Sequence, residues 1–247
     1  MNLELHGKSV LITGGSKGIG LACAKAFAAE GCRVHIASRD KERLELARKQ
    51  LGANAQAHQA DLRDSQALRA LAQACADVDI LVNNAGDIPG GTLEALDEAK
   101  WRHAWELKVF GYVNLTRELF TRMKARKSGV IVNVIGMAGE KPSFEYVCGS
   151  MANAGLGAFT KAMGGGSTAF GVRVLGVHPP ATRTDRIVPL IKAAAKEKLG
   201  DENRWEELIG TGSFGHMIEP EQVADMVAFL ASARAGKLSG VMINLGA

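Results

Sequence analysis

Residues 10–20 read V-L-I-T-G-G-S-K-G-I-G, and this stretch decides how the chain is interpreted. A short apolar run ends at Thr13, glycines follow at Gly14, Gly18 and Gly20, and a helical pattern begins directly afterwards. Glycine lets a backbone approach a phosphate closely, and the free N–H groups and dipole of a helix N-terminus favour an anion. Strand, glycine turn and helix therefore predict a dinucleotide pyrophosphate site rather than an ordinary tight turn.

The composition narrows the class of protein. The 247 residues fit one large α/β domain, the 47% hydrophobic content supplies a core, and the net charge of +4 comes from scattered basic residues. Neither a basic patch for nucleic acid nor an apolar run for a membrane or a targeting segment is found. Four cysteines lack CxxC pairs and His/Cys metal spacing, so we expect reduced thiols, no metal site and a soluble cytoplasmic protein.

Apolar strand patterns alternate with amphipathic helical patterns along the chain. The expected strands are 9–13, 33–37, 55–58, 80–83, 130–134, 172–177 and 241–244. The expected helices are 19–30, 41–51, 65–75, 97–126, 150–169 and 221–231. This alternation predicts an α/β fold, with a doubly wound parallel sheet of about seven strands and helices on both faces. No linker or repeat divides the chain, so we expect one domain over residues 1–247.

One segment departs from this alternation. Residues 184–215 mix apolar side chains with many charges and lie beyond the carboxyl end of a strand, where open α/β sheets bind ligands. We interpret the segment as a lid over a substrate. An ordinary pair of surface helices is the alternative.

The end of the second expected strand predicts which dinucleotide binds. Ser38 and Arg39 stand where an acidic residue would hold the ribose hydroxyls of NAD, and they suit a 2′-phosphate instead. Lys17 in the glycine turn would add a second positive charge. Asp40 is expected to cap the following helix. NADP(H) is therefore expected in preference to NAD(H).

Further motifs identify a family. Asp61-Leu62 follows the third strand, Asn83-Asn84-Ala85-Gly86 follows the fourth, and His178-Pro179 precedes Thr184. With the T-G-x-x-x-G-I-G pattern and the spacing between the motifs, the chain resembles the short-chain dehydrogenase/reductase family nearly from end to end. The resemblance implies a single Rossmann-like domain, a bound NAD(H) or NADP(H), and a homodimer or homotetramer.

The resemblance also implies the cofactor contacts. Thr184 would contact the nicotinamide carboxamide, although Pro180 stands where the family has glycine after Pro179. The expected cofactor-binding residues are Gly14, Ser16, Lys17, Gly18, Ile19, Gly20, Ser38, Arg39, Asp61, Leu62, Asn83, Ala85, Gly86, Pro179 and Thr184.

The catalytic positions of the family have all changed. The family uses Asn, Ser, Tyr and Lys, with Tyr as general acid/base. The aligned positions of this chain hold Lys108, Gly136, Gly149 and Asn153. A general acid/base contributes typically ~10²–10⁴ in rate. Gly149 has no side chain for that role, so the family's usual mechanism cannot run on these residues.

Three side chains are candidate replacements, each with an alternative. Lys108 either supplies the missing cation in the cleft, or turns outward, or pairs with Glu106 or Glu140. Tyr146 lies about one helical turn before Gly149, so it either reaches the cleft or packs at the helix start. His178 is either an acid/base at the ligand edge or a hydrogen-bonded structural residue.

Three functions are compatible with this pattern. The first is an NADP(H)-linked oxidoreductase acting on a carbonyl or alcohol with a rebuilt catalytic set. The second is a nucleotide-binding protein without redox chemistry, acting as a sensor or partner subunit. The third is a lyase or isomerase that uses the pocket without hydride transfer. The replaced catalytic positions favour the second function. The preserved cofactor motifs and the lid-like segment favour the first, which we therefore expect.

Overall fold

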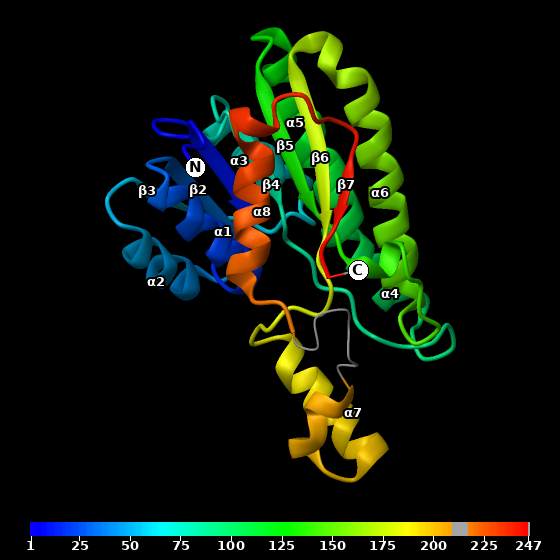
Figure 1. Cartoon of the computed structure of the whole chain (residues 1–247). Coiled ribbons are helices and arrows are strands. Elements are labelled where there is room, and N and C mark those ends of the chain that lie inside the picture. Colours follow the sequence, from blue (N-terminus) through cyan, green and yellow to red (C-terminus); the bar gives the residue numbers. More distant parts are fainter. Residues whose placement is uncertain (209–216, 247) are drawn as a thin grey trace.

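Seven strands form one sheet in the computed structural model, which describes residues 1–208 and 217–246 (Figure 1). The strands are β1 (Ser9–Thr13), β2 (Arg33–Ser38), β3 (Ala55–Gln59), β4 (Ile80–Asn83), β5 (Gly129–Val134), β6 (Val172–His178) and β7 (Met242–Asn244). All neighbours pair in parallel, in the order β3-β2-β1-β4-β5-β6-β7. The predicted doubly wound parallel sheet is confirmed.

Helices cover both faces of this sheet. The α-helices are α1 (Gly18–Ala29), α2 (Lys41–Leu51), α3 (Ser65–Ala74), α4 (Glu98–Trp105), α5 (Gly111–Ala125), α6 (Val147–Ser167), α7 (Ile187–Leu199) and α8 (Pro220–Ala231). Shorter helical turns are η1 (Glu106–Phe110), η2 (Met137–Gly139), η3 (Thr168–Phe170), η4 (Glu202–Leu208) and η5 (Ala233–Ala235). Helices α1, α2 and α8 pack on one face, and α3, α5 and α6 pack on the other.

The central strands are apolar because both of their faces are covered. Every residue of β1 and β4 is buried, and their side chains belong alternately to the two core clusters, with Ile12 on one face and Leu11 on the other. The chain crosses from β3 at one edge back to β4 beside β1. The carboxyl ends of β1 and β4 therefore form the switch point where such sheets bind ligands.

Two local expectations are settled by the structure. Asp40 is the N-cap of α2 and accepts a hydrogen bond from the Arg43 N–H at 3.0 Å, as predicted. The helix expected over residues 97–126 is found without a break from Glu98 to Ala125, but it contains a π-helical turn, η1, between α4 and α5 that was not predicted. π-helical turns are found frequently at functional sites, and this one carries Lys108.

The segment expected to be a lid begins with a helix. Helices α7 and η4 project away from the sheet (Figure 1). The backbone just before α7 is hydrogen-bonded to the backbone just before α8, since the Arg183 N–H donates to the Ile218 carbonyl at 2.9 Å. Residues 209–215 of the expected lid lie outside the described residues.

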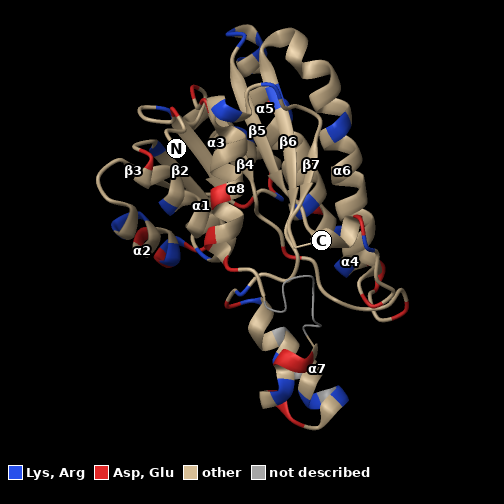
Figure 2. Cartoon of the chain, in the orientation of Figure 1, with Lys and Arg blue, Asp and Glu red and all other residues tan. Residues whose placement is uncertain are grey.

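Charges are interspersed rather than gathered by sign. In Figure 2, the ribbon of α2 and that of the α7–η4 projection each carry both basic and acidic positions. None of the helices in residues 1–208 and 217–246 combines the length and apolarity that crossing a membrane needs.

Candidate active site

A cavity of about 460 Å³ lies at the carboxyl ends of the central strands. Its walls are formed by the glycine turn after β1, the end of β2, the loop after β4 and the loop after β6. Most of the predicted cofactor-binding residues line it: Gly14, Ser16, Lys17, Gly18, Ile19, Ser38, Arg39, Leu62, Ala85, Gly86, Pro179 and Thr184. All four positions predicted to align with the family's catalytic residues lie near it, and Lys108, Gly136 and Asn153 line it directly.

Three predicted cofactor residues are not on the cavity wall. A methyl group at Gly20 would lie 2.2 Å from the Gly14 carbonyl oxygen, so this glycine allows α1 to pack against the turn. Asp61 pairs with Arg63 at 2.6 Å. Asn83 is buried and donates to Asn133 at 2.9 Å. These residues support the walls of the cavity rather than face it.

The glycine turn has the backbone that glycine alone adopts easily. Gly14 and Gly18 have φ angles of +67° and +54°. The Thr13 hydroxyl accepts hydrogen bonds from the backbone N–H groups of Asn84 and Ala85, at 2.9 and 3.1 Å. The turn and the loop after β4 are thereby held together at the switch point, where a dinucleotide would lie.

A shallow recess adjoins the cavity at the end of β2. Ser16, Lys17, Ser38, Arg39, Asp40 and Arg43 line it. The Ser16 hydroxyl donates to the Ser38 hydroxyl at 3.1 Å, so two short polar side chains face the same space as three cations. Arg39 is 45% exposed and lies 3.9 Å from Asp87, a weak pairing that leaves the guanidinium accessible to a phosphate.

Lys108 points inward and is buried. Its ammonium group donates to the carbonyl oxygens of Val134 and Ile135, both at 3.0 Å, and to the Tyr112 hydroxyl at 3.2 Å. Burial lowers the pKa of Lys108 to about 7, and Arg186 acts in the same direction. The alternative in which Lys108 turns outward toward Glu106 or Glu140 is therefore wrong. Its three donors are occupied by neutral oxygens, while its aliphatic stem packs beside Gly86 on the cavity wall.

The backbone at Gly136 does not suit a serine. Gly136 has a φ angle of +136°, a conformation that residues with a Cβ rarely adopt. A Cβ there would lie 2.9 Å from Asn153 Nδ2, so the two positions face each other. Asn153 is only 4% exposed, and its Oδ1 has no hydrogen-bond partner among the described residues. A buried orphan acceptor on a cavity wall fits a bound hydroxyl group, which suits the ribose of a dinucleotide.

The ring of Tyr146 occupies the space that a side chain at position 149 would need. A Cβ built on Gly149 would lie 2.0 Å from two ring carbons of Tyr146 and 2.6 Å from its hydroxyl oxygen. Tyr146 precedes α6 as its N-cap residue and lines the cavity. The structure thus brings a phenol to the place where a side chain at position 149 would begin.

The pKa of the Tyr146 phenol is set by its burial and by one nearby cation. Burial raises the pKa of Tyr146, and the positive charge that opposes this shift is that of Arg186. The guanidinium of Arg186 donates to the carbonyl oxygens of Gly86 and Ile88, at 3.1 and 2.8 Å, so it is held on the cavity wall. Sequence reasoning missed this residue, because no motif contains it.

His178 does not line the cavity in the described structure. It is 1% exposed, and its Nδ1 donates to the Gly136 carbonyl at 2.7 Å. Nε2 lies 3.4 Å from Glu140 Oε1 without hydrogen-bond geometry. Burial lowers the pKa of His178. This placement fits the structural alternative, in which the ring supports the unusual backbone at Gly136.

Comparisons with known proteins agree with the fold. Residues 8–195 match the short chain dehydrogenase family. The 3-oxoacyl-(acyl-carrier-protein) reductase of Vibrio cholerae is 30% identical, over 99% of this chain and 97% of that protein. The structure of L-sorbose reductase from Gluconobacter frateurii, complexed with NADPH and L-sorbose, superposes with a TM-score of 0.93 at 28% identity. The match covers 99% of this chain and 97% of that one.

A further structure binds the other nicotinamide cofactor. The 3-ketoacyl-(acyl-carrier-protein) reductase from Brucella melitensis, complexed with NADH, has a TM-score of 0.86 at 26% identity. It covers 98% of both chains. Similar proteins thus carry either NADPH or NADH in this fold.

Proposed function

Since this chain belongs to the short-chain dehydrogenase/reductase family, we propose that it is an NADP(H)-linked oxidoreductase that interconverts a carbonyl and an alcohol, with Tyr146 as proton donor. One observation carries the proposal: the phenol of Tyr146 fills the space above Gly149 and faces the cavity that also contains Lys108 and Asn153. The Tyr146 hydroxyl lies where a side chain at position 149 would begin, so it would serve the cavity from a shifted origin.

Different residues on the cavity wall can donate the proton, stabilise charge and bind the cofactor in such a reaction. A bound nicotinamide supplies or accepts the hydride. Reduction leaves charge on the substrate oxygen, which a positioned acid must neutralise. Burial keeps the Tyr146 phenol protonated and ready to donate, and the nearby charge of Arg186 stabilises the phenolate that remains. Asn153 Oδ1 is free to accept a hydrogen bond from a ribose hydroxyl.

The recess beside Ser38 supports the preference for NADP(H). A 2′-phosphate placed there would meet Lys17, Arg39 and Arg43, together with two serine hydroxyls. Guanidinium groups bind phosphate through paired hydrogen bonds. An NAD ribose would lack these interactions, and Asp40 is already engaged as a helix cap.

The surroundings of the cavity support two further parts of the proposal. The α7–η4 segment acts as the substrate lid, because Asp185, Arg186 and Ile187 at its base line the cavity. Lys198 of α7 also forms an ion pair with Glu145, the residue before Tyr146, at 3.3 Å.

A homodimer or homotetramer in the cytoplasm is expected from the family, and the exposed side chains of Phe110 and Met151 offer apolar surface for contacts between subunits. Light scattering coupled to size exclusion measures the assembly.

The test replaces the phenol and then moves it. Tyr146→Phe should remove most turnover, by about 10²-fold or more, with NADPH binding nearly unchanged. Carbonyl turnover is followed through NADPH absorbance with a panel of ketones and ketoacyl thioesters. Phe144→Leu is the control, since Phe144 lies in the same loop and is 71% exposed. Wild-type turnover in Tyr146→Phe would overturn the assignment.

A second pair of variants separates lost chemistry from lost structure. Gly149→Tyr alone should be inactive and destabilised, because its side chain collides with the Tyr146 ring. Tyr146→Gly combined with Gly149→Tyr removes that collision and should regain measurable turnover over Tyr146→Gly alone. A double variant that folds and binds NADPH without such a gain would contradict the idea that the phenol's position matters.

A nucleotide-binding protein without redox chemistry is the second candidate. The three hydrogen bonds that occupy Lys108 favour it, because they leave this amine no donor for a cofactor ribose. This reading is the better one if NADPH binds tightly, no carbonyl of the panel is reduced, and Tyr146→Phe changes nothing.

A further inference from the structure

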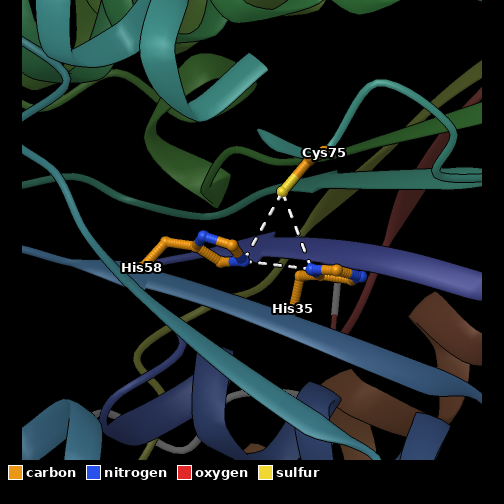
Figure 3. A group of neighbouring side chains, drawn as sticks. All are labelled: His35, His58 and Cys75. Atoms are coloured by element: carbon orange, nitrogen blue, oxygen red, sulfur yellow. Dashed lines mark hydrogen bonds between the residues drawn. The ribbon is translucent and has the colours of Figure 1, made fainter. Parts of the chain in front are cut away.

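Three side chains from three separate elements converge away from the cavity (Figure 3). His35 comes from β2, His58 from β3, and Cys75 from the residue that ends α3. His35 Nδ1 lies 3.0 Å from His58 Nε2, and Cys75 Sγ lies 3.7 Å from each of these nitrogens. The three potential ligand atoms therefore form a nearly regular triangle.

We propose that His35, His58 and Cys75 bind one Zn²⁺ ion through Nδ1, Nε2 and Sγ. Zinc binds imidazole nitrogen at about 2.0–2.1 Å and thiolate sulfur at about 2.3 Å. In a tetrahedral site these bonds give edges of about 3.3 Å between nitrogens and about 3.6 Å between nitrogen and sulfur. The observed 3.0 and 3.7 Å differ from those edges by a few tenths of an ångström.

The surroundings permit such an ion to reach its ligands. Both histidine rings are half-buried, which leaves a route for a cation, while Cys75 is buried behind them. The two ring planes are inclined by 20° to each other, and His35 Nδ1 and His58 Nε2 are the nitrogens in contact. A rotation of each ring would aim both lone pairs at an ion displaced toward the sulfur, and the terminal torsion of histidine is broad enough to allow it. The fourth position is left to water.

A zinc ion here would join the end of α3 to the paired strands β2 and β3. In the described chain β3 is an edge strand that pairs with β2, and its residues after Ala55 are half-buried or exposed. The ion would clamp this strand and its neighbour to the end of α3. None of the three ligands lines the cofactor cavity, so the site stands independently of the proposed reductase activity.

The sequence gives no signal for this site. The ligands are separated by 22 and 16 intervening residues, and no pair has the short spacing of a zinc motif. Only the parallel pairing of β2 with β3, which places Ala37 opposite His58, brings the two histidines to the same face.

The experiment measures zinc binding by the full-length chain after metal removal with a chelator. Zn²⁺ is titrated in competition with a chromophoric chelator, and Co²⁺ serves as a spectroscopic probe, since a thiolate ligand adds a charge-transfer band. The wild type should bind one Zn²⁺ per chain and unfold at a higher temperature with zinc present. Its Co²⁺ form should show the thiolate band.

Variants identify the ligands. His58→Gln and Cys75→Ala should each weaken zinc binding at least about tenfold, and Cys75→Ala should lose the thiolate band. His6→Gln and Cys23→Ala are the matched controls, one exposed histidine and one buried cysteine outside the cluster. Equal zinc affinity in all four variants would overturn the proposal, as would a wild-type Co²⁺ spectrum without the band. The spectrum keeps the test decisive even if a ligand variant fails to fold.

Discussion

Replacing Lys108 by methionine should change stability in a way that depends strongly on pH. The ordinary pKa of lysine is 10.5, and burial lowers the pKa of Lys108 to about 7 in the folded protein. The unfolded chain therefore binds more protons between pH 7 and 10.5, so wild-type stability rises with pH across that window. The difference corresponds to a destabilisation of about 5 kcal/mol below pH 7, declining by about 1.4 kcal/mol per pH unit above it.

Methionine removes that cost and introduces a smaller one. It keeps a similar apolar stem beside Gly86 but leaves the Ile135 carbonyl without the donor that Lys108 supplies. The Val134 carbonyl still accepts from the Tyr112 hydroxyl at 2.8 Å. An orphaned buried acceptor costs about 1–3 kcal/mol. Lys108→Met should thus be about 2–4 kcal/mol more stable than the wild type at pH 6, and less stable at pH 10.

Urea unfolding followed by tryptophan fluorescence at pH 6, 7, 8, 9 and 10 measures this difference. Effects of the carboxylates cancel, because they are common to both proteins. Lys25→Met is the control: Lys25 is exposed on α1, and its substitution should give a stability change independent of pH. A Lys108→Met stability difference equal at pH 6 and pH 9 would refute the reasoning, since it would mean that the buried amine carries no pH-dependent cost.

Three further predictions concern Arg39 at the end of β2, Gly20 after the glycine turn, and Gly136. Arg39→Ala should weaken NADPH binding about 10–100-fold and NADH binding much less, by titration calorimetry; equal wild-type affinities for the two cofactors would contradict it. Gly20→Ala should destabilise the chain by about 1–3 kcal/mol and weaken NADPH binding, because the added methyl meets the Gly14 carbonyl. The control Gly155→Ala enters open space in α6 and should be neutral or stabilising. Gly136→Ser should cost about 1–3 kcal/mol in thermal or urea unfolding without raising turnover, since its φ of +136° strains any side chain.

The strands of the sheet were predictable because each of them has a recognisable sequence pattern. Apolar runs bounded by glycine and polar turns gave all seven strands, with end points within about one residue of the structure. The cap formed by Asp40 was predictable for the same reason: the side chain acts on the next three residues of its own chain. Both features depend on residues that are close together in the sequence, so a sequence pattern is sufficient to predict them.

The site was less predictable, because its contacts join distant segments. Arg186 is hydrogen-bonded to the loop after β4, which lies 98 to 100 residues earlier in the chain. No pattern in the residues around Arg186 predicts these hydrogen bonds. The motif residues Asp61 and Asn83 look like cavity residues by position, yet each is turned to a protein partner. The π-helical turn at Lys108 arises within a continuous amphipathic pattern, so periodicity predicted one unbroken helix.

The packing of Tyr146 over Gly149 also bears on how this chain could have arisen. The two positions cannot both hold a large side chain, because the ring atoms of one overlap the first carbon of the other. A descent from an ancestor with tyrosine at 149 must therefore have passed through a form with no phenol in the cavity or one that was overcrowded. Either intermediate is at a disadvantage, and the same barrier stands against reversal. Relatives with glycine at 149 and tyrosine at 146 should accordingly be found together on one branch of descent, and the two substitutions should appear as a pair.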